Sequence, residues 1–284
     1  MRPIGLMFCL ALVLSTKAWA FEAEFLSASA VELGNPHDVK LSPDGKQLFV
    51  SDVDNDRVVI LDAESLALVG HFGDDHQNGT HDVDFDAAGR LYVADTHNHR
   101  VGVYELDGPT GKLVEELAGE LRKPEGVLVG QDGSVYVTGA GTGNLVIYRG
   151  GAPVKQVGGL SSPHDIEFAP DGDLWVADAA NDRMVRMTPD LETVKVLEGE
   201  AYDFSGPRYL DVAPDGTLVV ADKYSHSVKV IAEDGKLLGI IGDGGAGQGP
   251  GKFRTPEGVE LRGDTVWIAD SGNDRIVKYR LSWD

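Results

Sequence analysis

The chain has 284 residues, enough for one large domain or two of ordinary size with a substantial buried core. Its single cysteine, Cys9, excludes a disulfide-stapled scaffold and a cysteine-ligated metal centre, and its net charge of −21 disfavours nucleic acid and anionic lipid as partners and favours cations or basic partners. The 36 glycines and the short apolar runs broken by Asp-Gly turns indicate an all-β protein.

The first twenty residues differ in composition from the rest of the chain. An apolar run over residues 4–14 follows Arg2, and Ala18-Trp19-Ala20 has the small-x-small pattern of a cleavage site. We interpret residues 1–20 as a signal peptide. The alternative, an uncleaved anchor, is disfavoured because a spanning helix needs about 20 apolar residues. The sequence therefore predicts a secreted or periplasmic protein, with a single domain over residues 21–284 and no membrane insertion after cleavage.

A four-residue phrase recurs six times after this segment, with starts 44, 44, 39, 44 and 49 residues apart. Its copies are Pro36-His37-Asp38-Val39, Thr80-His81-Asp82-Val83, Pro124-Glu125-Gly126-Val127, Pro163-His164-Asp165-Ile166, Pro207-Arg208-Tyr209-Leu210 and Pro256-Glu257-Gly258-Val259. Each phrase opens a strand, and a turn such as Pro43-Asp44-Gly45 indicates a hairpin to a second strand. The second strand ends in Asp, and a third begins after Asn and Arg, as at Asp95, Asn98 and Arg100 in the second repeat. A fourth segment is more variable, for example residues 112–114.

Each repeat is therefore expected to form a four-stranded antiparallel sheet. One such sheet cannot cover both of its faces, whereas six arranged radially cover one another. The predicted fold is an all-β, six-bladed β-propeller of four-stranded antiparallel blades. The last repeat stops near Tyr279 without an outer strand, and residues 23–33 precede the first phrase with no partner of their own. We expect this N-terminal strand to complete the sixth blade and close the ring.

The recurring Asp-x-x-Asn-x-Arg pattern, together with the Pro-x-Gly-Val phrase, resembles the NHL repeat family over nearly all of residues 21–284. The resemblance implies a six-bladed propeller. WD40 repeats have a similar length but carry paired Gly-His and Trp-Asp marks that this sequence lacks. We interpret the repeated Asp, Asn and Arg as structural, because short polar side chains satisfy turn backbone and Arg can pair with a nearby carboxylate.

Two repeats depart from this pattern. The third has Gly139-Ala140-Gly141-Thr142-Gly143-Asn144 in its place, and the fifth has Asp222-Lys223-Tyr224-Ser225-His226-Ser227. The third has lost both Asp and Arg, and the fifth has lost Asn and Arg. Two interpretations remain open: decay of the repeat, or room for a ligand.

The innermost strand of a propeller blade lines the central channel, so the residue after each phrase's first position is expected near the axis on one face. The six residues are His37, His81, Glu125, His164, Arg208 and Glu257. Histidine and glutamate in this number are ligands for a divalent metal. We take His37, His81, His164 and Glu257 as candidate ligands, with His81, His164 and Glu257 on alternate blades as one facial tripod. Zinc is the first candidate and calcium the second; a hydrated pore without metal is the alternative.

The ring is similar to that of peptidyl-α-hydroxyglycine amidating lyases, six-bladed propellers in which Pro-His phrases of alternate blades hold zinc. The resemblance places ligands at His81, His164 and Glu257, with Glu257 where that family has His. The family's catalytic Tyr would fall within residues 139–143, which contain no tyrosine. Tyr224 offers a tyrosine two repeats later.

Two classes of function follow from the sequence. In the first, the protein is a scaffold that binds a protein, peptide or small-molecule ligand at the pore face. In the second, it is a metal-dependent lyase or hydrolase, with Glu125 or Tyr224 as the base and Arg208 binding a substrate carboxylate. We expect a monomer in either case.

Overall fold

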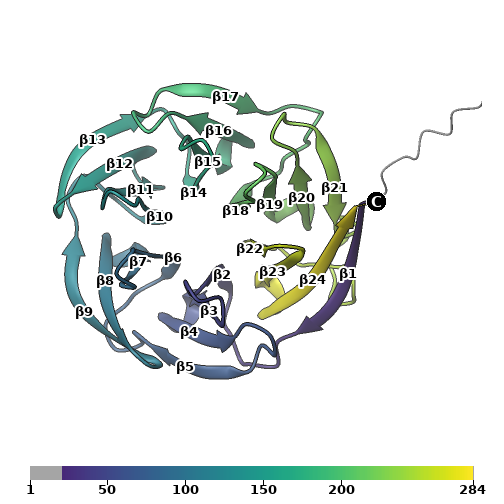
Figure 1. Ribbon diagram of the computed structural model, residues 1–284, viewed down its shortest axis with the longest axis horizontal. Coiled ribbons are helices and arrows are strands. Elements are labelled where there is room, and N and C mark those ends of the chain that lie inside the picture. The colour runs from purple at the N-terminus through teal and green to yellow at the C-terminus, as the bar shows by residue number, and fades with distance from the viewer. Residues whose placement is uncertain (1–20, 284) are drawn as a thin grey trace, which may run out of the picture.

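A computed structural model describes residues 21–283 as a ring of six four-stranded antiparallel sheets (Figure 1). The predicted all-β, six-bladed fold is confirmed. The signal peptide expected over residues 1–20 lies outside the described residues, as does Asp284. Within residues 21–283, no helix is long and apolar enough to cross a membrane.

The blades share one strand order from the centre outward (Figure 1). The innermost strands are β2 (Pro36–Leu41), β6 (Thr80–Phe85), β10 (Pro124–Val129), β14 (Pro163–Phe168), β18 (Pro207–Val212) and β22 (Val259–Arg262). The second strands are β3 (Gln47–Asp52), β7 (Leu91–Asp95), β11 (Val135–Gly139), β15 (Leu174–Asp178), β19 (Leu218–Asp222) and β23 (Thr265–Asp270).

The third strands are β4 (Arg57–Asp62), β8 (Arg100–Asp107), β12 (Asn144–Arg149), β16 (Arg183–Met187), β20 (Ser227–Ile231) and β24 (Arg275–Trp283). The outer strands are β5 (Leu68–Phe72), β9 (Thr110–Leu117), β13 (Ala152–Gly158), β17 (Thr193–Leu197), β21 (Leu237–Ile241) and β1 (Phe21–Ala28). Short 3₁₀ turns join second to third strands in all blades but the third: η1 (Val53–Asn55), η2 (Thr96–Asn98), η3 (Ala179–Asn181), η4 (Lys223–Ser225) and η5 (Ser271–Asn273).

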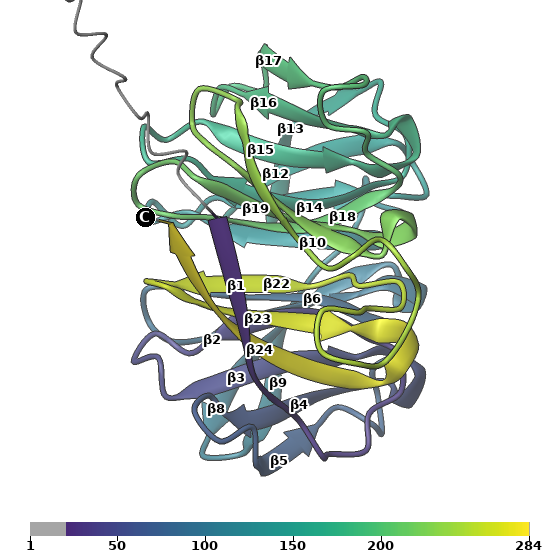
Figure 2. The same ribbon diagram turned by 90° about the vertical axis from the view of Figure 1, so that its right-hand side faces the viewer.

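The two ends of the described chain close the ring, as the sequence predicts. Strand β1 pairs antiparallel with β24 from Phe21 opposite Trp283 to Ala28 opposite Val277. Figure 2 shows β1 lying along β24. The Ser29 amide continues the pairing by donating to the Ile276 carbonyl at 2.8 Å. The sixth blade thus takes three strands from the end of the chain and one from its beginning.

The core lies between neighbouring blades. The second strands are buried on both faces, so they are almost wholly apolar before their final Asp; every residue of β7 and of β15 is buried. One apolar cluster joins Phe49 and Ile60 of the first blade to Val83, Leu91 and Tyr104 of the second. Since each interface needs both blades, no blade is stable as an isolated sheet.

The repeated Asp, Asn and Arg are structural, as expected. In the second blade the buried Asp95 carboxylate accepts hydrogen bonds from Asn98 Nδ2 at 2.9 Å and Arg100 Nε at 2.7 Å, and from the Asn78 amide at 2.8 Å. The same Asp–Arg ion pairs recur at Asp52–Arg57, Asp178–Arg183 and Asp270–Arg275.

A further repeated contact was not foreseen from the sequence. The residue before each of these arginines, or before Ser227 in the fifth blade, has a left-handed backbone. Its side chain accepts a hydrogen bond from a backbone amide that leads into the next blade, as Asp56 Oδ1 does from the Gly79 amide at 2.6 Å. The equivalents are Asp182 to Gly206, Asp274 to Asn35, His99 to Lys123 and His226 to Thr255. Each acceptor therefore fixes the backbone two residues before a pore-ring residue.

Candidate functional site

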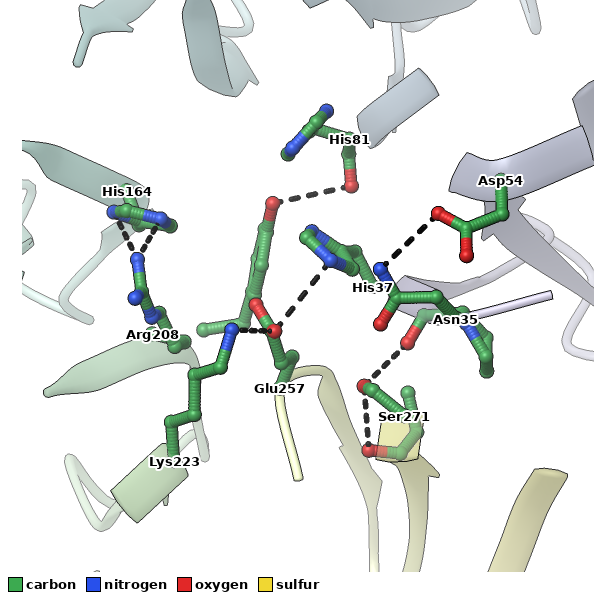
Figure 3. Close-up of polar contacts among 12 residues, drawn as sticks. Asn35, His37, Asp54, His81, His164, Arg208, Lys223, Glu257 and Ser271 are labelled. Carbon is green, nitrogen blue, oxygen red and sulfur yellow. Dashed lines mark hydrogen bonds and ion pairs between the residues drawn. The ribbon is translucent and has the colours of Figure 1, made fainter. Parts of the chain in front are cut away.

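The six ring residues lie together at one end of the channel, as the repeat predicts. His37, His81, Glu125, His164 and Glu257 are buried, and Arg208 is half-buried. Figure 3 shows His37, His81, His164, Arg208 and Glu257 pointing toward a common centre from five different blades. Five of the ring residues are the second residue of an inner strand, whereas Glu257 lies two residues before β22 begins at Val259.

The structure gathers a trio from three neighbouring blades. Ligand atoms of His37, His81 and Glu125 all lie within 4.8 Å of one another. His81 Nε2 is 3.3 Å from Glu125 Oε2, and the rings of His37 and His81 meet edge to face with centroids 4.5 Å apart. The sequence instead predicts a tripod from alternate blades, with Glu125 as a base rather than a ligand.

The other two expected ligands have different partners. His164 contacts the Arg208 guanidinium through Nε2, and that nitrogen is 3.7 Å from Glu125 Oε2. Glu257 pairs with Lys223 Nζ through Oε1, which is also 3.4 Å from His37 Nε2. His164 and Glu257 therefore border the trio of His37, His81 and Glu125 while being held by cations.

Two of the histidines carry their ring proton on the nitrogen facing away from the centre. His81 Nδ1 lies 2.8 Å from the Gly79 carbonyl, and His164 Nδ1 lies 2.8 Å from the Ser162 carbonyl. A carbonyl can only accept, so Nδ1 donates and Nε2 keeps its lone pair. This second hydrogen bond is the one that orients histidine ligands in metal sites. The sequence gives little indication of this hydrogen bond, because the two residues that supply the carbonyls, Gly79 and Ser162, share only a left-handed backbone.

Burial sets the charge state of the trio. It lowers the pKa of both His37 and His81 to about 3, assisted at His37 by Lys223 and Arg208 and at His81 by His37. Burial, with the nearby Glu257 carboxylate, raises the pKa of Glu125 to about 8. At neutral pH the imidazoles are uncharged, which is the form that binds metal.

Several polar atoms in the ring are buried without a hydrogen-bond partner within residues 21–283. They are His37 Nδ1, Glu125 Oε2, Glu257 Oε2 and Arg208 Nε. An unpaired buried polar atom costs about 1–3 kcal/mol, more if charged, so four in one place are groups that a bound ion, ligand or water would satisfy. Two neutral imidazoles and a carboxyl group that gives up its proton on binding suit a divalent metal ion, and the residues present therefore fit the metal inferred from the sequence.

The opposite side of the ring is cationic. Arg208 Nη2 lies 3.4 Å from the Tyr224 hydroxyl, and the guanidinium carbon is 5.9 Å from the Tyr224 ring centroid. Tyr224 is 57% exposed, and Gly206 leaves room for it, since a Cβ there would lie 2.7 Å from the tyrosine ring. Lys223, which the sequence analysis did not select, adds a second cation beside Glu257. Tyr224, Arg208 and Lys223 thus form the side of the ring that faces the trio.

Below the ring the channel is filled by buried carboxylates that join the blades. Asp82 Oδ2 accepts from the Val127 amide at 2.5 Å, and Asp165 Oδ2 accepts from the Leu210 amide at 2.7 Å. Tyr209 lies between the rings of His37 and His164 and donates to the His81 carbonyl at 3.2 Å. These side chains form the floor of the site, so access to the trio is from the ring face.

The raised pKa of Glu125 predicts a pH-dependent stability in the metal-free protein. The folded pKa of about 8 exceeds the ordinary 4.5, so stabilisation by the bound proton is complete below pH 4.5 and is lost as the pH rises through about 8. The slope is at most about 1.4 kcal/mol per pH unit. Urea denaturation in chelator should show the wild-type unfolding free energy falling relative to Glu125→Gln from about pH 5 to about pH 8. A pH-independent difference would contradict the raised pKa.

Comparison with known proteins agrees with the architecture. The family model for the NHL repeat matches residues 80–104, which span strands β6 to β8 of the second blade. The other five blades repeat the same strand order. The chain is an NHL-type β-propeller. A search of curated proteins finds no match.

Solved structures similar to this NHL-type propeller include two lyases. A streptogramin B lyase matches with a TM-score of 0.66 at 15% identity, covering 93% of this chain and 98% of that one. A catalytically inactive histidine-to-alanine variant of virginiamycin B lyase from Staphylococcus aureus, with quinupristin, matches with a TM-score of 0.66 at 13% identity, covering 93% and 100%. Hydrazine synthase of Kuenenia stuttgartiensis matches with a TM-score of 0.64 at 16% identity, covering 90% and 99%. At these identities the likeness establishes the fold.

Proposed function

We propose that this NHL-type propeller is a metal-dependent lyase acting on a peptide or other small molecule at the pore face, outside the cytoplasm and as a monomer. The observation that carries the proposal is the buried trio of His37, His81 and Glu125, whose ligand atoms converge within 4.8 Å. Three protein ligands of these types, with a position left open, are typical of catalytic zinc sites. Two imidazoles favour zinc over calcium, which takes six to eight oxygen ligands.

The residues around the trio supply the remaining parts of a lyase site. A divalent ion held there would supply a Lewis acid for a substrate oxygen. Arg208 and Lys223 would bind a substrate carboxylate, since both are cations facing the same centre. Tyr224, acting as a phenolate, would accept the substrate proton, and the electron pair of the broken bond to hydrogen would form the new double bond. The electron pair of the bond to the leaving group would depart with that group. The proton on Tyr224 would then pass to the leaving group, which regenerates the phenolate and consumes no water.

The elimination can be separated from hydrolysis by isotope labelling. Zinc-loaded and chelated protein would be incubated in ¹⁸O-water with a streptogramin B antibiotic, a peptidyl-α-hydroxyglycine and an aromatic lactone, and the products weighed by mass spectrometry. The aldehyde acid formed from the hydroxyglycine is left out of the ¹⁸O readout, because its carbonyl oxygen exchanges with water. We expect zinc-dependent cleavage of at least one substrate without ¹⁸O in the product. Incorporation of ¹⁸O would make the protein a hydrolase. Zinc bound with no cleavage of any substrate would favour the scaffold role.

Tyr224→Phe separates metal binding from chemistry. The hydroxyl is exposed and lies outside the trio of His37, His81 and Glu125, so the variant should keep zinc while kcat falls about 100-fold or more, the usual effect of removing a positioned acid–base group. Steady-state kinetics and elemental analysis on one preparation would measure both. Unchanged kcat would remove Tyr224 from the mechanism, and Tyr202→Phe is the matched control because that hydroxyl donates to the Gly235 carbonyl outside the ring.

A further inference from the structure

A second pocket opens on the outer part of the fifth blade, whose strands β18 to β21 are green in Figure 1. Its volume is about 470 Å³. Its lining includes Ser225 at the end of the turn η4, Ser227 at the start of the third strand β20, Tyr202 from the loop before β18, and Ile240 on the outer strand. None of the six pore-ring residues lines it.

The regular blades show what normally occupies this place. Arg57, Arg100, Arg183 and Arg275 stand at the position equivalent to Ser227, five residues after the repeated Asp, and asparagines stand at the position of Ser225. Each arginine pairs through Nε with its Asp at 2.7–2.8 Å. Arg57 and Arg100 also donate through Nη2 to the carbonyl four residues before the phrase of their own blade, at 3.2 Å and 3.0 Å.

The fifth blade keeps these bonds without using the arginine volume. Lys229, two residues further along β20, pairs with Asp222 and donates to the Asp203 carbonyl at 2.6 Å. Its Nζ also lies 4.8 Å from the Phe204 ring centroid. Lys229 thus satisfies the Asp222 carboxylate and the Asp203 carbonyl, the groups that arginine bonds in the regular blades. The small side chains of Ser225 and Ser227 leave the rest of the arginine position empty, and their hydroxyls bond each other at 2.7 Å.

The third blade also lacks the arginine, and it too has a pocket at the equivalent place. Asn144, at the arginine position, donates to the Glu120 carbonyl at 3.2 Å and to Gln156 Oε1 at 2.9 Å. Glu120, Gln156 and Val146, which stands at the equivalent of position 229, line a pocket of about 310 Å³. Both blades without the arginine are therefore open here, and the fifth-blade pocket has the greater volume of the two.

The charge around the fifth-blade pocket favours a cation. Lys229 is neutralised by Asp222, and Asp243 pairs with Lys252 at 2.6 Å. Glu200 and Asp203 line the pocket and form no ion pair within residues 21–283. Leu237, Ile240 and the Tyr202 ring, stacked on Phe204 with centroids 5.5 Å apart, give it an apolar wall. An aliphatic chain ending in a cation matches both features.

We propose that the fifth-blade pocket binds a guanidinium side chain, an arginine from a peptide or partner protein, in the place that the regular blades fill with their own arginine. The stem lies along Ile240 and Tyr202, and the guanidinium faces Glu200 and Asp203. This site is independent of the pore and of the proposed lyase activity.

The test uses N-acetylarginine methylamide as the probe, titrated calorimetrically into the protein. The matched neutral probe is N-acetylcitrulline methylamide. A restored variant, Ser225→Asn/Ser227→Arg/Lys229→Val, gives the fifth blade the residues of its regular neighbours; Val59, Val185 and Val277 stand at the equivalent of position 229. The variant should fold with an unchanged or higher Tm, because its own arginine occupies the pocket.

We expect the arginine probe to bind the wild type, and both the citrulline probe and the restored variant to show at least about tenfold weaker binding, which is about 1.4 kcal/mol. His81→Ala should bind the arginine probe as the wild type does, since the pore is not involved. Free arginine binding as tightly as the blocked probe would identify the free amino acid as the ligand source. Equal binding of citrulline, equal binding by the restored variant, or no binding to the wild type would each overturn the proposal.

Discussion

Deletion of residues 21–33 should lower the melting temperature by more than about 10 °C, the largest stability effect expected for this protein. The deletion removes β1, and with it the outer strand of the sixth blade and its pairing from Phe21 to Ala28. It also removes the edge contact of Phe25 with Tyr279, with ring centroids 5.5 Å apart, and the buried Leu33 of the first-blade core. Since about 1 kcal/mol moves Tm by about 2–4 °C in a domain of this size, loss of a strand and its apolar contacts exceeds 10 °C.

A shorter deletion supplies the control. Removal of residues 1–20 alone leaves β1 intact and should leave Tm unchanged in a calorimetric scan. The deletion of residues 21–33 also exposes the edge of β24, so aggregation on heating is expected with it. Equal melting temperatures for the two deletions would mean that ring closure by β1 contributes nothing to stability.

The second large effect is stabilisation by metal. Zinc at about 100 times its Kd should add about 2.7 kcal/mol to the free energy of unfolding. In a domain of this size, that corresponds to a rise of about 5–10 °C in Tm over chelated protein. His81→Ala and Glu125→Ala should each remove most of this rise, because each takes one ligand from the trio of His37, His81 and Glu125. Differential scanning fluorimetry at fixed zinc would measure it.

His71→Ala is the matched control for these substitutions, because His71 lies exposed on the outer strand β5. It should keep the full zinc effect. A zinc-dependent rise that survives His81→Ala and Glu125→Ala would place the metal elsewhere, and the absence of any rise in the wild type would argue against a metal site at the pore.

The sequence predicted the fold because the repeat fixes it. Six in-phase copies of one phrase specify six equivalent blades, and a missing outer strand at one end matched a spare strand at the other. The same periodicity predicted which side chains lie near the channel axis, because each is the second residue of an inner strand: His37, His81, Glu125, His164 and Arg208.

The sequence could not predict which ring members meet. Equivalent backbone positions led to the expectation of a tripod from alternate blades, whereas the side-chain conformations bring neighbouring His37, His81 and Glu125 together. That outcome depends on Lys223 holding Glu257 and on Arg208 holding His164, and both contacts cross between blades. The position of Lys223 holds Val53, Thr96, Ala179 and Ser271 in the regular repeats, so the repeat gives no signal for the contact with Glu257.

The irregular repeats were informative in different ways. The fifth repeat lost Asn and Arg, and the structure shows a pocket at that place. Lys229, which lines the pocket, forms the ion pair with Asp222 that arginine forms with Asp in the regular blades. Lys229 lies outside the repeated motif, so its substitution for arginine is visible only once the strand places both residues on one face. In the third repeat Asn144 takes the arginine position and donates to Gln156 Oε1, which lines a smaller pocket on that blade.

The most direct test of the metal site is anomalous diffraction from crystals of the zinc-loaded protein, with data on both sides of the zinc absorption edge. The predicted result is one strong anomalous peak within about 2.0–2.2 Å of a nitrogen of His37, a nitrogen of His81 and an oxygen of Glu125, the distances usual for zinc. A peak bound by other residues, or no peak in zinc-soaked crystals whose His37, His81 and Glu125 side chains are well ordered, would contradict the account.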